Sequence, residues 1–146
     1  MTAQPVEILL VEDNEDDIVL IQEAFADTRL VNVLSTVRDG EEALAYLRRE
    51  GRYKDAHRPG LVLLDINMPK KNGFEVLESL KADPRLRPLP VIMLTTSDRE
   101  EDIALSYANG AWSFIRKPVD VAWLKGVVQQ FDQYWTLVWR IPGYRE

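Results

Sequence analysis

Short, nearly continuous apolar runs alternate along the chain with longer segments in which apolar residues recur at helical spacing. Apolar runs of about 4–8 residues bounded by polar ones are typical of buried strands. The expected strands are 6–11, 31–37, 61–65, 90–94 and 112–116.

The segments between these runs predict helices. The first three apolar stripes consist of Ile18, Ile21, Ala24 and Phe25, then Ala43, Leu44 and Leu47, then Phe74, Leu77 and Leu80. Ser97 and Glu100 match a capping box, which predicts the start of a fourth helix, and Asn109-Gly110 supplies its stop. A fifth helix is expected from about Val119.

Five expected strands alternate with five expected helices, and each strand is nearly all apolar. Strands of this kind are buried on both faces, which indicates a doubly wound α/β fold with a five-stranded parallel sheet. The 146 residues suit one domain, 1–146, with a core over about 6–135 and a C-terminal extension, 136–146, that forms an interface or a tail.

Composition narrows the classes of function. The net charge of −6 argues against binding nucleic acid through the general field of the protein. No cysteine is present, which excludes disulfides and cysteine-ligated zinc, and no apolar run reaches membrane-spanning length. The first residues lack the pattern of a signal peptide, so a cytoplasmic protein with no membrane partner is expected.

Two features are interpreted as solvated surface. The densest basic group is Arg48, Arg49, Arg52, Lys54 and Arg58, which fits a helix end and loop better than a ligand site. His57 is the only histidine and lies in the same loop. It is not expected to donate a phosphoryl group, so any donor is another molecule.

Reactive groups follow four of the expected strands. They are Glu12 and Asp13 after the first, Asp65 at the end of the third, Thr95 after the fourth and Lys117 after the fifth. In open parallel sheets the site lies beyond the carboxyl ends of the strands, so these groups should converge. Each alone fits a cap or a surface residue, whereas one functional group after each of four strands favours a site.

The expected cluster suits Mg²⁺ and phosphoryl transfer. Hard carboxylate oxygens are the ligands that Mg²⁺ takes. The expected metal ligands are Asp13 and Asp65 directly, Glu12 through water, and the backbone carbonyl of Asn67. Thr95 and Lys117 could neutralise a transferring phosphoryl group, with Asp65 as the nucleophile.

Four motifs carry a resemblance to a known family. They are Val11-Glu12-Asp13-Asn14, Leu64-Asp65-Ile66-Asn67-Met68-Pro69 with Gly73, Leu94-Thr95-Thr96-Ser97 and Phe114-Ile115-Arg116-Lys117-Pro118. Over about residues 6–135 the chain resembles the receiver domains of two-component response regulators, which implies a flavodoxin-like fold with strand order 2-1-3-4-5 and a histidine kinase as partner.

The resemblance also implies residue roles. Asp65 would be the phosphoacceptor, Glu12 and Asp13 the acidic pair for Mg²⁺, Thr95 the switch hydroxyl, Lys117 the phosphate-contacting lysine and Phe114 the switch aromatic. The bond between Lys117 and Pro118 would be cis. Glu12 departs from the commoner Asp, and Phe114 from Tyr, without affecting phosphorylation.

A narrower resemblance concerns the loop and the C-terminal part. Three stretches are similar to stand-alone receivers paired with bacterial and cyanobacterial phytochrome histidine kinases: Pro69-Lys70-Lys71-Asn72-Gly73, Leu94-Thr95-Thr96-Ser97, and the ending from Phe131 through Tyr134-Trp135 to Ile141-Pro142. This similarity implies a red-light pathway with a bacteriophytochrome as kinase.

The last helix is more apolar than a helix on a sheet needs. Its two stripes are Val121, Leu124, Val128, Phe131 and Trp135, and Trp123, Val127, Tyr134 and Val138. A surplus stripe predicts an exposed interface. We expect a homodimer through the fourth helix, fifth strand, fifth helix and tail, formed by Trp123, Val127, Tyr134, Trp135, Val138, Trp139 and Ile141. The alternative is a tail that folds back onto its own domain.

Three other functions are weighed. A haloacid-dehalogenase-like phosphatase also uses an Asp nucleophile and Mg²⁺, but it needs an Asp two residues later, where this chain has Asn67. A nucleotide- or flavin-binding domain needs a phosphate loop after the first strand, where Glu12 and Asp13 would repel phosphate. A DNA-binding regulator does not fit the length and charge.

Overall fold

The computed structural model describes residues 6–27, 32–68, 70–96 and 99–138. The elements within these ranges are β1 (Val6–Val11), α1 (Glu15–Ala26), β2 (Asn32–Val37), α2 (Gly40–Arg48), the 3-10 helix η1 (Gly51–Tyr53), β3 (Leu61–Asp65), α3 (Gly73–Ala82), β4 (Val91–Thr95), α4 (Glu100–Ala108), β5 (Ser113–Arg116) and α5 (Val121–Val138). The predicted alternation of strands and helices is confirmed.

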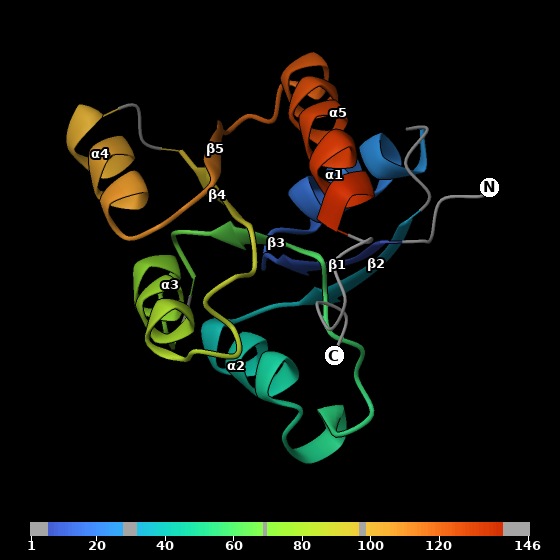
Figure 1. The fold of residues 1–146 in the computed structure, drawn as a ribbon. Helices are drawn as coiled ribbons and strands as arrows, with labels where there is room; N and C mark the ends of the chain where they lie inside the picture. Colours follow the sequence, from blue (N-terminus) through green and yellow to red (C-terminus); the bar gives the residue numbers. More distant parts are fainter. Residues whose placement is uncertain (1–5, 28–31, 69, 97–98, 139–146) are drawn as a thin grey trace.

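The strands form one parallel sheet in the order β2-β1-β3-β4-β5, as the resemblance implied. Helices α1 and α5 lie on one face, and α2 and α3 lie on the other (Figure 1). In β1, Ile8 and Leu10 point to the first face and Leu9 and Val11 to the second, because successive strand side chains alternate. Both faces are therefore buried.

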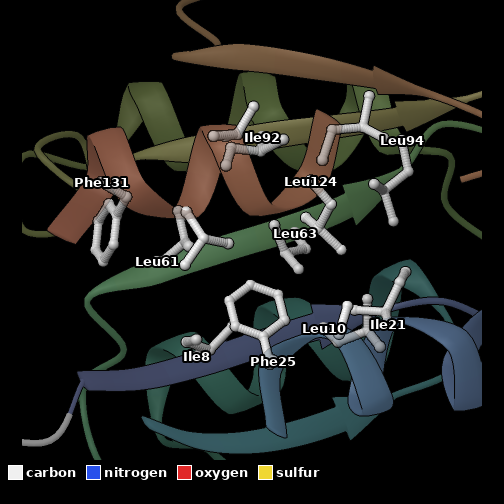
Figure 2. Packing of buried hydrophobic residues seen from close by; sticks show 14 of the residues in the cluster. Ile8, Leu10, Ile21, Phe25, Leu61, Leu63, Ile92, Leu94, Leu124 and Phe131 are labelled. Carbon is white, nitrogen blue, oxygen red and sulfur yellow. The ribbon is translucent and has the colours of Figure 1, made fainter. Parts of the chain in front are cut away.

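The core under α1 and α5 is built from large side chains. Phe25 of α1 and Phe131 of α5 pack toward Leu61 and Leu63 of β3 (Figure 2), and both rings are almost completely buried. Burial of an aromatic ring removes roughly 150–250 Å² of apolar surface from water. These contacts hold α1 and α5 against the strands whose ends carry the reactive groups.

The predicted start of the fourth helix is wrong. Helix α4 begins at Glu100 with Arg99 as its N-cap residue, which makes no side-chain capping bond. Glu100 therefore occupies the first helical position instead of the third, where a capping-box Glu must lie. Ser97 lies outside the described residues. The capping box of this fold is at α3, where Asn72 and Glu75 satisfy each other's backbone N–H groups.

The two apolar stripes of α5 are not divided into one buried and one exposed face. Val127 and Trp135 are both 6% exposed and belong to the core under α1 and α5. Tyr134 is half-buried beside Phe131, with ring centroids 5.7 Å apart, whereas Trp123 is 56% exposed. Residues of both stripes thus join the core, and only part of the predicted surplus reaches the surface.

Trp135, near the end of α5, packs closely against Gly60. A Cβ atom on Gly60 would lie 2.5 Å from the ring of Trp135 and 2.8 Å from a methyl of Val6. We expect Gly60→Ala to lower the free energy of unfolding by about 2 kcal/mol, because overpacking a well-filled core costs about 1–3 kcal/mol. Urea denaturation measures it.

Gly126→Ala is the matched control, because no atom lies within 4 Å of its Cβ position on α5. It should raise stability by up to about 1 kcal/mol, since Ala favours helix more than Gly does. Equal effects of the two substitutions would contradict the close approach at Gly60.

In the described part of the chain, none of the helices is long and apolar enough to cross a membrane.

Candidate functional site

The register of the sheet brings the first acidic groups together. Val11 of β1 pairs with Leu64 of β3, so Glu12 and Asp65, each one residue further, leave the sheet side by side. Both are buried, with 0% and 3% exposure. Two buried carboxylates this close are stable only with positive charge or hydrogen bonds nearby.

Asp13 completes an acidic cluster with these two residues. One carboxylate oxygen from each of Glu12, Asp13 and Asp65 lies within 4.8 Å of the others. Asp13 is exposed, so the cluster opens to solvent on its side. The second oxygen of Glu12 accepts hydrogen bonds from the backbone N–H groups of Asp13 and Asn14, at 3.0 and 3.2 Å. The loop after β1 thereby holds Glu12 in place.

Lys117 supplies the positive charge. Its Nζ lies 2.5 Å from Glu12, 3.0 Å from Asp17 and 3.3 Å from Asp65. The Lys117 side chain is 9% exposed, and its backbone N–H donates to the carbonyl of Thr95 over 2.6 Å. The bond from Lys117 to Pro118 is cis, as the resemblance implied.

Burial and charge act in opposite directions on Lys117. Burial lowers the pKa of this ammonium, but hydrogen bonds to Glu12 and Asp17 and the charges of Asp65 and Glu12 raise it by more. The pKa of Lys117 therefore stands above its ordinary value, and the group is a permanent cation at neutral pH.

Asp65 is perturbed the other way. The pKa of its carboxyl is raised to about 7, first by burial and then by the hydrogen bond and charge of Glu12. The charge of Lys117 and a hydrogen bond from the N–H of Asn67, 3.2 Å from Asp65 Oδ1, lower it by less. Without a further cation, the cluster holds more negative charge than Lys117 alone balances.

Thr95 and Phe114 lie on the two strands beyond Asp65. Asp65 pairs with Leu94, so Thr95 is one residue further along β4, and it is 2% exposed. Phe114 of β5 is half-buried, and its ring meets Tyr107 of α4 edge to face, with centroids 5.9 Å apart. The structure thus places the predicted switch pair on adjacent strands, between the acidic cluster and α4.

The acidic cluster fits a divalent cation. Its donors are hard carboxylate oxygens converging from two loops, and the burial of Glu12 and Asp65 makes their mutual repulsion costly. Such donors suit a cation of the Mg²⁺, Mn²⁺ or Ca²⁺ type and not a thiolate-seeking metal.

Asp17 is a site residue that the sequence patterns missed. It lies in the first turn of α1, where acidic residues are expected for their favourable interaction with the helix dipole. The helix-dipole explanation gives no hint of the ion pair between Asp17 and Lys117, which are far apart in the sequence.

The predicted surface on α5 is placed only in part. Trp123 is strongly exposed, and Leu105 and Tyr107 of α4 are also about half exposed. Trp139, Ile141 and the side chain of Val138 lie outside the described residues. His57 is exposed, and Arg52 of the basic group pairs with Glu42, as expected for surface residues.

Comparisons with known proteins agree with this geometry. The model of the response regulator receiver domain matches residues 8–129. The response regulator Rcp1 of Synechocystis sp. is 38% identical over 95% of this chain and 95% of its own length. The probable methanogenesis regulatory protein FilR2 of Methanothrix harundinacea is 42% identical over 95% of this chain and 89% of its own.

Solved structures give the same result. The phosphorylated cyanobacterial phytochrome response regulator RcpA is 47% identical with a TM-score of 0.79, over 91% of this chain and 95% of its own. The Mn²⁺-bound form of Rcp1 is 40% identical with a TM-score of 0.78, over 90% and 94%. These similarities do not support the phosphatase alternative. The chain belongs to the response regulator receiver domain family.

Proposed function

We propose that Asp65 accepts a phosphoryl group from a histidine kinase, with Mg²⁺ at the acidic cluster, and that the modified surface is the signal. The observation that supports this most is the convergence of Glu12, Asp13, Asp65 and Lys117 at the carboxyl edge of the sheet. It joins a nucleophile, metal ligands and a fixed cation, which phosphoryl transfer requires.

Each residue has a chemical part in the transfer. A carboxylate oxygen of Asp65 attacks phosphorus, a new O–P bond forms, and the P–N bond to the donor's imidazole breaks. Mg²⁺, when bound by Asp13, Asp65 and the Asn67 carbonyl, with Glu12 acting through water, would neutralise phosphoryl oxygens. Lys117 would contact another of these oxygens, and the Thr95 hydroxyl would donate to a third.

Turnover should be confined to the chain's own phosphoryl group. A phosphatase of the haloacid-dehalogenase type needs an acid/base carboxyl two residues after the nucleophile, and Asn67 cannot exchange protons in that way. We therefore propose a phosphoacceptor signalling role, without an external substrate.

The direct test is to incubate the protein with Mg²⁺ and acetyl phosphate and measure its intact mass. We expect the mass of one phosphoryl group to be added, and no addition when EDTA removes Mg²⁺. Beryllofluoride, which mimics an acyl phosphate, should shift the amide NMR signals of Asp65, Thr95 and Lys117. An unmodified mass under conditions that phosphorylate RcpA would reject the proposal.

The pathway is proposed from the relatives. RcpA is a cyanobacterial phytochrome response regulator, and the pattern Pro69 to Gly73 resembles such receivers. We propose a bacteriophytochrome as the kinase. FilR2 shows that a comparably similar chain carries a different regulatory name, so phosphotransfer rates from a purified phytochrome kinase and an unrelated kinase should be compared. Faster transfer from the unrelated kinase would remove the red-light assignment.

We also propose that the chain forms a homodimer through α4, β5, α5 and its C-terminal tail. Trp123 and Leu137 on α5 are 56% and 66% exposed, and large apolar side chains this exposed favour an interface. Phosphorylation would draw Thr95 inward and let Phe114 follow, which would alter the same surface.

A cytoplasmic location stays a prediction.

Trp123→Ser tests the dimer. Light scattering should show a dimer for the unchanged protein at about 100 µM, and at least tenfold weaker association for the variant, since a central Trp typically contributes 2 kcal/mol or more. Val19→Ser is the control, because Val19 is 48% exposed on α1, away from the proposed interface. A monomer with and without beryllofluoride would reject the dimer.

A further inference from the structure

The loop between β3 and α3 carries Asn67 and is closed on itself by Gly73. The N–H of Gly73 donates to the carbonyl of Ile66 over 2.9 Å. A Cβ atom on Gly73 would lie 2.4 Å from the carbonyl oxygen of Asp65, so no larger residue fits there without movement. The end of the loop is therefore pressed against the backbone of the phosphoacceptor.

The outer side of this loop rests on helix α2. A Cβ atom on Gly40, the first residue of α2, would lie 2.2 Å from the carbonyl oxygen of Lys71 and 2.8 Å from its Cβ. The carbonyl oxygen belongs to the backbone and a Cβ atom does not move with χ1, so a rotamer change of Lys71 cannot relieve these contacts. Gly40 thus permits a close approach between the start of α2 and the loop.

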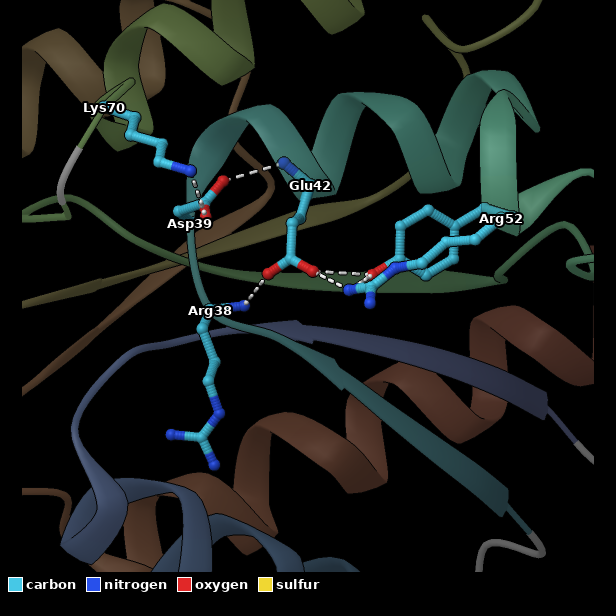
Figure 3. A network of polar contacts seen from close by, with 6 residues as sticks. Arg38, Asp39, Glu42, Arg52 and Lys70 are labelled. Atoms are coloured by element: carbon cyan, nitrogen blue, oxygen red, sulfur yellow. Dashed lines mark hydrogen bonds and ion pairs between the residues drawn. The ribbon is translucent and has the colours of Figure 1, made fainter.

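A second contact joins the same two segments. Lys70 has a left-handed backbone with φ +67°, which is unfavourable for a residue with a Cβ, and its Nζ lies 3.6 Å from Asp39 Oδ2. Asp39 Oδ1 accepts from the N–H of Glu42 over 2.8 Å (Figure 3). One carboxylate therefore caps α2 and holds the loop.

Helix α2 is itself fastened at this end. The Glu42 carboxylate accepts from the N–H of Arg38 at 3.3 Å and from the Tyr53 hydroxyl at 2.8 Å, and it pairs with Arg52 (Figure 3). The α2 terminus is thus a fixed support.

We propose that the N-terminus of α2 positions the metal-binding loop, with Gly40, Asp39 and Lys70 as positioning residues for the Asn67 carbonyl. The inference rests on the proposed function, since it concerns the metal that Asp65 needs. Gly40 sets how near the loop lies to α2, and the Asp39–Lys70 pair holds Lys70 in its left-handed backbone. Together they determine where the loop presents its carbonyl to the cation.

The experiment measures Mg²⁺ and Mn²⁺ dissociation constants by calorimetry and the metal-free amide NMR signals of Asn67 and Met68. We expect Gly40→Ala to weaken both metals by about tenfold or more, because displacement of a site group by about 1 Å can cost up to about 100-fold. Lys70→Met should weaken them about threefold, as an exposed pair of this kind contributes little. Both variants should shift the two amide signals.

The control variants distinguish an effect on the position of the loop from an effect on the overall stability of the protein. Gly126→Ala adds a methyl on α5 with no neighbour, and Lys125→Met removes an exposed ion pair between α5 and Asp27, on the face of the sheet opposite α2 (Figure 1). Both should bind metal within about twofold of the unchanged protein. Asp39→Asn keeps the cap, because Asn is an equally good N-cap, but weakens the pair. The Asp39→Asn, Lys70→Met double variant should bind no more weakly than the worse single variant.

The outcomes distinguish the two levels of inference. If the unchanged protein binds neither cation, the proposed function fails and the positioning role with it. If it binds them and Gly40→Ala and Lys70→Met match the controls, only the positioning role is rejected. Should Gly40→Ala fail to fold, Lys70→Met and Asp39→Asn decide alone: unshifted Asn67 signals and unchanged affinities reject the role, and shifted signals with weaker binding support it.

Discussion

Asp65→Asn is expected to abolish phosphorylation by acetyl phosphate, lowering the initial rate of adduct formation by at least about 1,000-fold. An amide is not a nucleophile under these conditions, and Glu12, the other buried carboxylate of the cluster, is engaged with Lys117 and two backbone N–H groups. Intact mass after incubation with Mg²⁺ and acetyl phosphate measures the loss.

The same substitution should stabilise the metal-free fold. A pKa raised from 3.8 to about 7 means that folded Asp65 binds a proton more readily than unfolded Asp65. Its contribution to stability is therefore lost as pH rises from about 4 to 7, by at most about 4 kcal/mol. Asn does not titrate, and losing the ion pair with Lys117 offsets part of the gain, so we expect about 2 kcal/mol at pH 8 and almost none at pH 4.

Asp120→Asn is the matched control for both measurements. Asp120 Oδ1 accepts from the N–H groups of Ala122 and Trp123 at the start of α5, and an amide oxygen can do the same. This variant should keep the adduct and its stability should change by less than about 0.5 kcal/mol. An adduct that persists in Asp65→Asn would mean that another residue carries the phosphoryl group.

Lys117→Met is expected to destabilise the metal-free protein by about 3 kcal/mol at pH 8 and to slow phosphorylation about 100-fold. Removing one partner of a buried ion pair costs about 3–5 kcal/mol because the remaining charge is uncompensated. Here Glu12 and Asp65 would remain buried, with Asp17 beside them. The kinetic loss is that of one electrostatic contact to the transferring group.

The way in which this loss of stability changes with pH and with Mg²⁺ should be opposite to that of an ordinary surface ion pair. The charge of Lys117 lowers the pKa of Asp65, so without this lysine that pKa rises further. Asp65 then takes up a proton as pH falls, and the destabilisation should shrink between pH 8 and pH 5. Millimolar Mg²⁺ should restore part of the loss, since it supplies positive charge to the same oxygens. Thermal unfolding at both pH values, with and without Mg²⁺, tests this.

Lys125→Met is the matched control. Lys125 pairs with Asp27 at 2.7 Å, but its side chain is 43% exposed and that of Asp27 is 74% exposed. Exposed pairs contribute about 0–1 kcal/mol, so the change should be small and independent of Mg²⁺. If the two lysine variants lose similar stability, the cluster around Lys117 is not electrostatically crowded.

Much of the fold could be predicted from the periodicity of the apolar residues and the order of the expected strands and helices. The strand boundaries were within one residue of the sequence expectation, because an apolar run between polar residues has few alternatives in a buried sheet. The start of α4 was misplaced, since Ser97 to Glu100 satisfies the local capping pattern without being the cap. Local hydrogen-bonding signals offer several equivalent starts, and tertiary packing selects one.

The residues of the candidate site likewise fall into those that could be predicted from the sequence and those that could not. Glu12, Asp13, Asp65, Thr95 and Lys117 could be found from the sequence because each lies at or just after the carboxyl end of a strand, and parallel strands end at a common edge. Asp17 could not be separated from the other acidic residues in the first turn of α1. The contact of Gly40 with Lys71 left no pattern at all, since it depends on how α2 meets a loop far along the chain.

The residue pattern alone predicts that a carboxylate at position 65 ends a buried strand among other reactive strand ends, because strand period and polarity are local properties. The charge balance around that carboxylate and the contacts that support it arise from tertiary packing. The raised pKa of Asp65, the three partners of Lys117 and the contact of the β3–α3 loop with α2 depend on burial and on distances between segments. Those quantities exist only once the sheet register is set and the helices are packed against it.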